Sequence, residues 1–320
     1  MTDQSQNGRN DDGPDIQRLE NQGGDDHDGV IDFGFRTVRR EAKRGMVRDV
    51  FDSVASRYDV MNDLMSGGVH RLWKAAMIDW IAPQPVQTLV DLAGGTGDIS
   101  QRFLTAGGGN AIVCDINEAM LAAGRQRRDM IRLADRVRWC TGNAEALPFE
   151  TASADIVTIA FGLRNVTDRD AAIAEAHRIL RPGGRFLCLE FSQVSNAALA
   201  RVYDSWSFNV LPRLGQLVAG DADSYRYLVE SIRTFPSPEI LADMFAGAGF
   251  AQVRVRRLSG GIACIIPAGS STDARLRPAD AAGAVSPADD RLASGPGRYA
   301  GASGAGVHVA DLDAAHLQIR

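Results

Sequence analysis

The stretch LVDLAGGTGDIS, residues 89–100, joins a run of apolar residues to an aspartate, three glycines and a threonine. The apolar residues up to Leu92 predict a buried strand, and the polar residues after Gly97 predict the start of a helix. A strand that turns into a helix through glycines brings bare backbone close to a ligand. The stretch therefore predicts an α/β fold with a ligand at this turn, and the alternative is a plain tight turn.

The spacing of the glycines distinguishes between two kinds of nucleotide cofactor. A dinucleotide fingerprint, G-x-G-x-x-G, is incomplete here, and a pyrophosphate at the helix start would meet the like charge of Asp98. The pattern D-x-(G/A)-x-G-x-G fits instead, at Asp91, Ala93, Gly95 and Gly97. This pattern is typical of sites for S-adenosylmethionine, which carries a sulfonium cation and no phosphate. The turn is therefore interpreted as a methyl-donor site.

Two further strand ends support the same cofactor. Asp115 ends the second predicted strand, where its carboxylate can accept hydrogen bonds from both ribose hydroxyls. The alternative for Asp115 is an N-cap of the helix that follows. GNAEALPF, residues 142–149, follows the third strand. There Asn143 is predicted to bind the adenine edge, and Ala144 to donate hydrogen bonds from its backbone. The alternative for this stretch is a polar loop with no such role.

Apolar strands and amphipathic helices alternate along the middle of the chain. The strands are predicted at 88–93, 111–116, 137–142, 154–161 and 185–191, with a closing antiparallel pair at 250–258 and 261–266. The helices are predicted at 43–60 and 69–82, from 97 onward, and at 117–128 and 168–180. We therefore predict an α/β, doubly wound, mostly parallel seven-stranded sheet of the Rossmann-like class I methyltransferase type, with a C-terminal antiparallel hairpin.

A segment without this alternation follows the fifth strand. Residues 192–236 are aromatic and polar, and we predict a helical lid there, above the carboxyl ends of the strands. The two ends of the chain also differ in composition from the core. We predict a disordered acidic tail at 1–32, a methyltransferase domain at 33–268, and a disordered Ala/Gly-rich tail at 269–320.

Charge and cysteine usage exclude several classes of function. Residues 1–32 carry a net charge of −7 in a chain whose total is −5, so the remainder is near +2 and has no basic stripe. A nucleic-acid partner is therefore not expected. The four cysteines form no close pair, which argues against a disulfide framework and a metal site. Without an apolar run of ~18 residues or an export signal, a cytoplasmic protein is expected.

Longer motifs resemble the ubiquinone/menaquinone biosynthesis C-methyltransferases of the UbiE type. The resemblance runs from Phe33 to Ile265 through FGFRTV, VASRYDVMNDLMSGGVHRLWK, LAGGTGD, NAEALPF, FGLRNVTD and DADSYRYLVESI. It implies S-adenosylmethionine-dependent methylation of a ring carbon, on a polyprenylated benzoquinol (2-methoxy-6-polyprenyl-1,4-benzoquinol) or on demethylmenaquinol. The cofactor positions that it implies are Thr96, Asp115, Asn143, Ala144 and Ala160.

The chain departs from the family pattern at two positions. Ala160 stands where the family usually has a serine, and Ile266 stands where it has a histidine. Because of these departures, an alternative hypothesis is a non-catalytic scaffold subunit that binds the methyl donor within a quinone-biosynthesis complex. Another small-molecule methyltransferase is a second rival, which the long FGLRNVTD and DADSYRYL matches oppose.

The chemistry of such a reaction indicates roles for particular side chains. A quinol ring carbon becomes a good nucleophile when the neighbouring hydroxyl loses its proton. Arg164 is predicted to stabilise the quinolate with Asn165 orienting it, and the alternative for Arg164 is a surface salt bridge. Asp223 is a candidate base or water-positioning residue, or else a helix N-cap. The candidates to line the ring pocket, or simply to pack, are Tyr58, Tyr225 and Tyr227.

A polyprenyl chain is dissolved in the membrane, which bears on where the protein works. We expect a cytoplasmic protein peripheral to the inner membrane, in contact with it through the apolar N-terminal helices and residues 202–219. The alternative is that these apolar residues close the core. A homodimer or a quinone-biosynthesis complex is the expected assembly. The apolar side chains of the second region are Trp206, Phe208, Leu211, Leu214 and Leu217.

Overall fold

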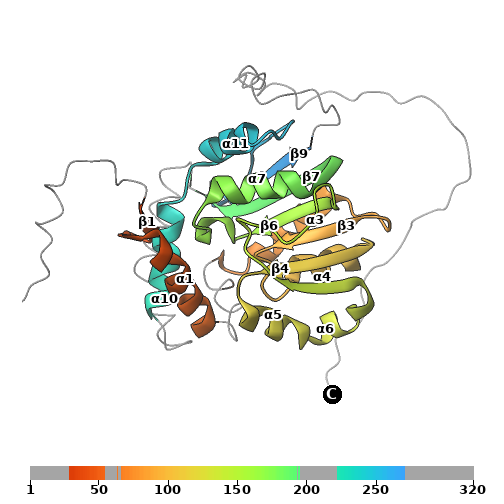
Figure 1. Cartoon of the computed structure of the whole chain (residues 1–320), viewed down its shortest axis with the longest axis horizontal. Helices are drawn as coiled ribbons and strands as arrows, with labels where there is room; N and C mark the ends of the chain where they lie inside the picture. Colours follow the sequence, from red (N-terminus) through yellow and green to blue (C-terminus); the bar gives the residue numbers. More distant parts are fainter. Residues whose placement is uncertain (1–28, 55–62, 64–65, 193, 195–221, 271–320) are drawn as a thin grey trace, which may run out of the picture. The chain divides into compact units, whose positions relative to one another are not determined.

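A single seven-stranded sheet organises the protein (Figure 1). The computed structural model describes residues 29–54, 63, 66–192, 194 and 222–270, all within the unit Met1–Ala282. The strand order is β5-β4-β3-β6-β7-β9-β8. The strands are β3 (Thr88–Leu92), β4 (Asn110–Asp115), β5 (Val137–Thr141), β6 (Ala154–Ala160), β7 (Leu180–Phe191), β8 (Arg256–Leu258) and β9 (Ala263–Gly269).

The direction of the strands confirms the predicted sheet. The strands from β3 to β7 pair in parallel, whereas β9 is antiparallel to both of its neighbours, β7 and β8. The chain runs outward from β3 through β4 to β5, then crosses back to β6 on the other side of β3. This reversal at β3 and β6 is the point where open α/β sheets place their ligands.

Helices cover both faces of the sheet because alternate strand residues point to opposite sides. Leu89 packs into one apolar cluster and the next residue, Val90, into the other. The helices in the Leu89 cluster are α3 (His70–Ile81), α4 (Asp98–Thr105), α5 (Glu118–Arg125) and α10 (Ala222–Arg233). Those in the Val90 cluster are α7 (Arg169–Ile179) and α11 (Pro238–Gly247). The short helices are α6 (Arg128–Ile131), η4 (Ala134–Arg136), η5 (Leu163–Asn165) and η7 (Ser259–Gly261).

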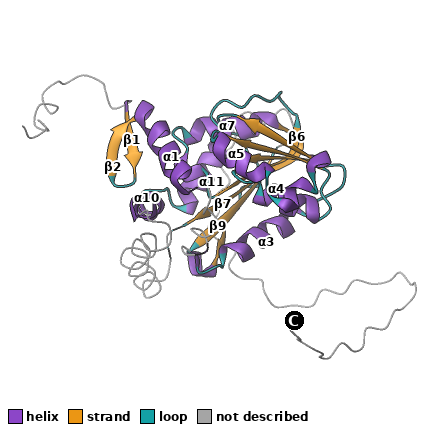
Figure 2. Ribbon diagram, turned by 90° about the horizontal axis from the view of Figure 1, so that it is seen from below, coloured by secondary structure: helices purple, strands orange, loops and turns teal. Residues whose placement is uncertain are grey.

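A small N-terminal unit lies outside this sheet. Strands β1 (Val30–Phe33) and β2 (Arg36–Arg39) form an antiparallel hairpin that leads into α1 (Arg40–Val54). The hairpin lies beside α1, and α1 contacts α10 and α5 (Figure 2). Residues 30–32 were expected in the acidic tail but form part of β1, because their backbone pairs with that of β2. The hairpin itself was not predicted.

The ends of several strands differ from the predicted ends. β7 begins at Leu180, before the predicted start at 185, so residues 181–184 (RPGG) lie within the strand as a bulge: Ala154 pairs with Leu180, and Ile156 pairs with Arg185. β8 covers only Arg256–Leu258 of the predicted 250–258 strand, which otherwise makes an isolated bridge from Ala251 to Gly269. Gly269, which was expected in the C-terminal tail, ends β9.

Helix α11 was not predicted, although the sequence contains a signal for its start. Ser237 caps the helix by accepting a hydrogen bond from the Ile240 backbone, and Pro238 occupies its first turn. Phe245 of this helix stacks on Phe186 of β7, with ring centroids 4.9 Å apart. Phe250 packs against both rings. The aromatic cluster fixes α11 to the sheet.

Two regions that carried predictions lie outside the described residues. They are the 55–62 segment, which holds Tyr58, and residues 195–221, which hold the apolar part of the predicted lid. Helix α10 falls inside the predicted lid segment and is helical as expected. A search of the described part of the chain found no helix with the length and apolarity required to cross a membrane.

Replacing Phe186 by alanine is expected to lower the free energy of unfolding by ~3–5 kcal/mol, because a fully buried ring is lost from the aromatic cluster. Urea unfolding followed by circular dichroism measures the change. Ile240→Ala is the control, since Ile240 is 55% exposed on α11 and its loss should have little effect. Equal effects of the two substitutions would show that α11 does not depend on the aromatic cluster.

Candidate active site

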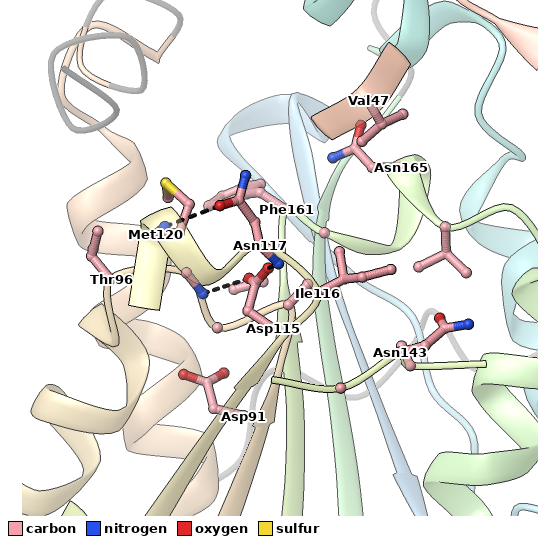
Figure 3. A pocket seen from close by; sticks show the side chains of 18 of the residues that line it. Val47, Asp91, Thr96, Asp115, Ile116, Asn117, Met120, Asn143, Phe161 and Asn165 are labelled. Atoms are coloured by element: carbon pink, nitrogen blue, oxygen red, sulfur yellow. Dashed lines mark hydrogen bonds between the residues drawn. The ribbon is translucent and has the colours of Figure 1, made fainter. Parts of the chain in front are cut away.

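A pocket of about 1160 Å³, including its open mouth, lies at the carboxyl ends of the central strands (Figure 3). The loops that follow β3, β4, β5 and β6 all contribute to its wall, and α1 contributes from the N-terminal unit. The reversal of strand order therefore holds a cavity, as an open α/β sheet predicts. Seven of the eight predicted cofactor positions line it: Asp91, Gly95, Thr96, Asp115, Asn143, Ala144 and Ala160. The eighth, Gly97, is the N-cap of α4 and is not part of the lining.

The glycine turn after β3 has little room for side chains. Gly95 and Gly97 have φ angles of 54° and 80°, which favour glycine. A Cβ on Gly94 would lie 2.8 Å from the Val113 side chain and 2.9 Å from the Asp91 carbonyl oxygen. The turn can therefore approach its neighbours and a ligand only as bare backbone.

Asp91 places a buried carboxylate on the floor of the pocket. It is 1% exposed, and it accepts hydrogen bonds from the Thr158 hydroxyl at 2.8 Å and the Ser100 hydroxyl at 3.0 Å. Burial raises the pKa of Asp91 to about 6, against the opposing effect of these two hydrogen bonds. A buried carboxylate of this kind gains stability from a nearby cation.

Asp115 places a second buried carboxylate at the end of β4. Its two oxygens accept hydrogen bonds from the backbone amides of Gly95 and Asn117, each at 2.8 Å. Burial raises the pKa of Asp115 despite these bonds. The alternative role as N-cap is wrong, because Asn117 caps α5 by accepting from the Met120 amide at 3.1 Å. Figure 3 shows Asp115 and Asn117 side by side in the wall of the pocket.

Three other predicted cofactor positions have neighbours that hold them in place. Thr96 accepts hydrogen bonds from Arg127 through both its carbonyl and hydroxyl oxygens. The Asn143 side chain accepts from the Glu145 amide at 3.1 Å, which fixes the turn after β5. Ala160 ends β6 and presents a methyl group where a serine would present a hydroxyl.

Asp98 was considered only as an obstacle to phosphate, yet it belongs to the pocket. Its carboxylate pairs with Lys74 at 2.8 Å and with Arg102 at 3.2 Å. Burial alone would raise the pKa of Asp98, but Lys74 and then Arg102 lower it to about 2. Asp98 is therefore a permanent negative charge on the pocket wall at neutral pH.

Arg164 makes an ion pair, but a buried one rather than the surface pair of the alternative reading. Its Nη1 lies 3.0 Å from Glu190 of β7, and both side chains are at most 1% exposed. The same nitrogen donates to the Phe161 carbonyl at 2.5 Å. Among the residues that the structure describes, the Nε and Nη2 atoms of Arg164 are buried without a hydrogen-bond partner. Arg164 is thus a fixed cation with unused donors, and it does not itself line the pocket.

Asn165, the residue after Arg164, lines the pocket. It forms a hydrogen bond with α10 and not with the arginine. Its Oδ1 accepts a hydrogen bond from the Tyr227 hydroxyl at 3.1 Å. Tyr225 and Tyr227 are 1% and 5% exposed, so both belong to the packed interior of α10. Neither tyrosine lines the pocket.

The remaining candidates lie away from the cavity or outside the described side chains. Asp223 is the second residue of α10, and its side chain is outside the described part, as is Tyr58. Ile266 is fully buried on β9, opposite Cys188, in the apolar cluster of α7 and α11. The position where the family has a histidine is therefore core in this chain.

Sequence reasoning missed the contribution of α1. Helix α1 was expected, but nothing in its sequence places it against the pocket, because that contact joins residues more than a hundred positions apart. Arg44 pairs with Glu145, whose other oxygen accepts from the Thr167 and Asp168 amides. The further pocket residues that were missed are Val47, Arg48, Lys74, Ile116, Asn117, Met120 and Phe161. The strand-end rule could have found Ile116 and Asn117, which follow β4 directly.

Within the described residues, no group of three or more His, Cys, Asp or Glu side chains could hold a metal ion. Cys114, Cys188 and Cys264 are buried free thiols, and Cys140 is a half-buried one.

Similar proteins share both the sequence and the fold. The ubiE/COQ5 methyltransferase family matches residues 36–269. The ubiquinone/menaquinone biosynthesis C-methyltransferase UbiE of Cereibacter sphaeroides is 57% identical over 242 residues, 75% of this chain and 97% of the relative. The protein of the same name from Paracoccus denitrificans is 58% identical over 234 residues, 73% and 94% of the two chains.

Solved structures with low identity support the fold alone. A S-adenosylmethionine-dependent methyltransferase from Thermotoga maritima superposes with a TM-score of 0.51 at 20% identity, covering 70% of this chain and all of the other. A phosphoethanolamine N-methyltransferase from Haemonchus contortus has a TM-score of 0.52 at 14% identity, covering 70% of this chain and 60% of its own. With most of the chain matched by one family and by close relatives, this protein belongs to the ubiE/COQ5 methyltransferase family.

Proposed function

We propose that this protein is a S-adenosylmethionine-dependent C-methyltransferase of ubiquinone and menaquinone biosynthesis. Its substrate would be 2-methoxy-6-polyprenyl-1,4-benzoquinol, demethylmenaquinol or both. The observation that carries this proposal is the 57% identity to a UbiE protein over 97% of that relative's length. We further propose that the strands and helices from β1 to β9 form the methyltransferase domain.

The pocket fits the proposed cofactor by charge and by shape. The donor is a sulfonium cation with an amino-acid end, and it supplies an electrophilic methyl group when bound. Asp91, Asp98 and Asp115 give the pocket negative charge, and the Gly94–Gly97 turn gives it bare backbone. We propose that Asp115 binds the ribose hydroxyls, and that the turn holds the amino-acid end.

The adenine and methyl ends would meet the loops after β5 and β6. Asn143 would bind the adenine edge and Ala144 would donate from its backbone. Ala160 would contact the cofactor through its backbone, because its side chain has no hydroxyl. This division follows the positions of the loops around one pocket.

Charge stabilisation would carry the methyl transfer. Loss of the phenol proton leaves a quinolate whose ring carbon attacks the methyl group, so a fixed cation nearby lowers the barrier. Arg164 has that cation and two unused donors, Nε and Nη2. Asn165 is its neighbour on η5 and has an unused donor as well. Tyr58 remains a proposed ring contact, and Asp223 a proposed base.

The scaffold alternative rests on Ala160, which removes one hydroxyl from the pocket wall. Such a subunit would bind the methyl donor but would not turn it over. Turnover by the purified protein separates the two functions.

In cells that lack this protein, a demethylated quinone should accumulate, and the wild-type gene should clear it. Arg164→Lys should clear it poorly, because lysine keeps a charge for Glu190 but lacks the second and third donors; loss of such donors costs about 100-fold in kcat. Lysine is preferred to alanine, which would leave Glu190 buried and unpaired at a cost of ~3–5 kcal/mol. Quinone profiling by mass spectrometry measures the outcome.

Arg181→Lys is the matched control, since Arg181 pairs with Asp155 with nearly half of its side chain exposed. It should clear the quinone as the wild type does. No accumulation in the deletion strain would contradict the proposed reaction, and full clearance by Arg164→Lys would contradict the role of the arginine.

Cofactor affinity should rise with pH through about 6. Asp91 has a raised pKa, so its contribution to folding stability is present below about 4 and is lost as the pH rises through about 6. A bound cation favours the ionised form, and binding at pH 5 should therefore be about tenfold weaker than at pH 7.5. Isothermal titration calorimetry with S-adenosylmethionine measures this slope.

Asp91→Asn should flatten the slope, leaving only the part that Asp115 contributes in the same direction. Asp98 should contribute nothing, because its pKa of about 2 keeps it ionised throughout. Asp79→Asn, on the exposed side of α3, is the control and should keep the wild-type slope. An unchanged slope in Asp91→Asn would refute the assignment.

We also propose peripheral contact with the inner membrane from the cytoplasmic side, through the N-terminal helices and residues 202–219, and a homodimer or a quinone-biosynthesis complex. The protein should float with quinone-containing liposomes. Trp206→Ser with Phe208→Ser should weaken binding at least about tenfold, because two apolar side chains would no longer enter the lipid. Val86→Ser is the control, since Val86 is 89% exposed at the amino ends of the strands. Equal flotation of all three proteins would rule out this contact.

A further inference from the structure

Helix α10 reaches the pocket through one hydrogen bond. We propose that Tyr227 is a positioning residue, which fixes the Asn165 amide so that Nδ2, and not Oδ1, faces an anionic oxygen of the substrate. This inference rests on the proposed function, because it names a donor for the same reaction. Nothing in the sequence motifs assigns Tyr227 this task.

The direction of the hydrogen bond decides the orientation of the amide. The Tyr227 hydroxyl lies 3.1 Å from Asn165 Oδ1, and this is its one hydrogen bond among the described residues. Burial raises the pKa of Tyr227 to about 12, even though Arg164 and Arg169 oppose the shift. The phenol is therefore protonated at neutral pH and has a proton to donate, and its hydroxyl faces Oδ1. Only Oδ1 of the amide can accept that proton.

The other end of the amide is left unused. Asn165 Nδ2 is buried and has no hydrogen-bond partner in the described part of the chain. A buried donor without an acceptor is costly, so such groups are rare unless a ligand completes them. Asn165 lines the pocket, and Figure 3 shows its nitrogen turned to the side where Asn117 and Met120 lie. The amide is thus a donor prepared for a ligand oxygen.

The tyrosine is in turn held by the N-terminal hairpin. The Phe33 ring of β1 stacks on Tyr227 with centroids 4.2 Å apart and planes 20° from parallel. The Glu230 carboxylate of α10 accepts a hydrogen bond from the Phe35 amide at 3.1 Å. The hairpin therefore fixes α10 at two points, one at the ring and one a helical turn away. This gives the phenol a defined position from which to hold the amide.

Charge near Asn165 favours an anionic oxygen over a neutral one. Arg164 is the preceding residue and has two unused buried donors. Arg169 at the start of α7 adds a second guanidinium, whose Nε is buried without a partner in the described part of the chain. Two acids act on these guanidinium groups: Glu190 pairs with Arg164, and Asp32 acts on Arg169 together with Glu190. The unpartnered donors of Arg164, Arg169 and Asn165 fit the oxygen of a quinolate.

A double-mutant cycle on the full-length protein tests the coupling. The turnover of a short-chain demethylmenaquinol, kept reduced, is measured for Tyr227→Phe, Asn165→Ala and the double variant. Tyr227→Phe keeps the stacked ring and should lower kcat about tenfold, because the amide is free to rotate. Asn165→Ala should lower kcat about 100-fold. The double variant should equal Asn165→Ala, since no amide remains to be positioned.

Two further measurements separate positioning from a structural role. The affinity for S-adenosylmethionine should stay within about twofold across the set, because the amide faces the substrate. Phe35→Leu, at the exposed tip of the hairpin, is the control and should keep the wild-type kcat. Multiplying losses in the double variant would overturn the proposal. A cofactor affinity that falls together with kcat would assign the amide to the cofactor and would overturn it too.

Nuclear magnetic resonance decides the positioning claim without turnover. In protein labelled with ¹⁵N-asparagine, the Asn165 side-chain signals are identified by their loss in Asn165→Ala. They should move in Tyr227→Phe, and unchanged signals would refute the hydrogen bond. A wild-type protein that turns over no quinol would refute the proposed function, whereas these signals would still test the role of Tyr227.

Discussion

Asp91 accepts hydrogen bonds from Thr158 on β6 and Ser100 on α4 while it lies on β3, so one carboxylate joins three elements. These elements meet where the order of the strands reverses. Burying a carboxylate is costly unless hydrogen bonds or a cation compensate, and here two hydroxyls compensate in part. Among the described residues, no cation pairs with Asp91. The Asp91 carboxylate therefore links these three elements, and its negative charge remains available to a cationic ligand.

The rest of the pocket depends on parts of the chain that are distant in sequence. Lys43 of α1 is 1% exposed and lies 3.4 Å from the Val166 carbonyl oxygen. Burial, followed by the nearby Arg169, lowers the pKa of Lys43 to about 8. Arg40 and Arg44 of the same helix pair with Asp168 and Glu145. Three cations thus hold α1 against the loops after β5 and β6. Helix α1, which lies outside the main sheet, therefore forms part of the pocket wall.

The two departures from the family pattern lie in different parts of the structure, one in the pocket and one in the core. Ala160 lines the pocket, so the loss of a hydroxyl there concerns the ligand directly. Ile266 is fully buried opposite Cys188 and packs with the aromatic residues that hold α11. An apolar residue suits that place, and a histidine would have to find polar partners. The family difference that bears on the pocket is therefore Ala160, and the one at Ile266 belongs to the core.

The sequence by itself determined the elements of the sheet and the cofactor side of the pocket. Apolar runs ending in Asp91, Asp115 and Ala160 are local signals, and parallel strands bring their ends to one edge. The sequence also carried the start of α11, at Ser237 and Pro238, which was overlooked. Only the tertiary structure decided which polar and charged side chains pair with one another. It pairs Arg164 with Glu190, gives Asn165 to Tyr227, and sets α1 on the pocket, because partners so distant in sequence leave no periodic signal.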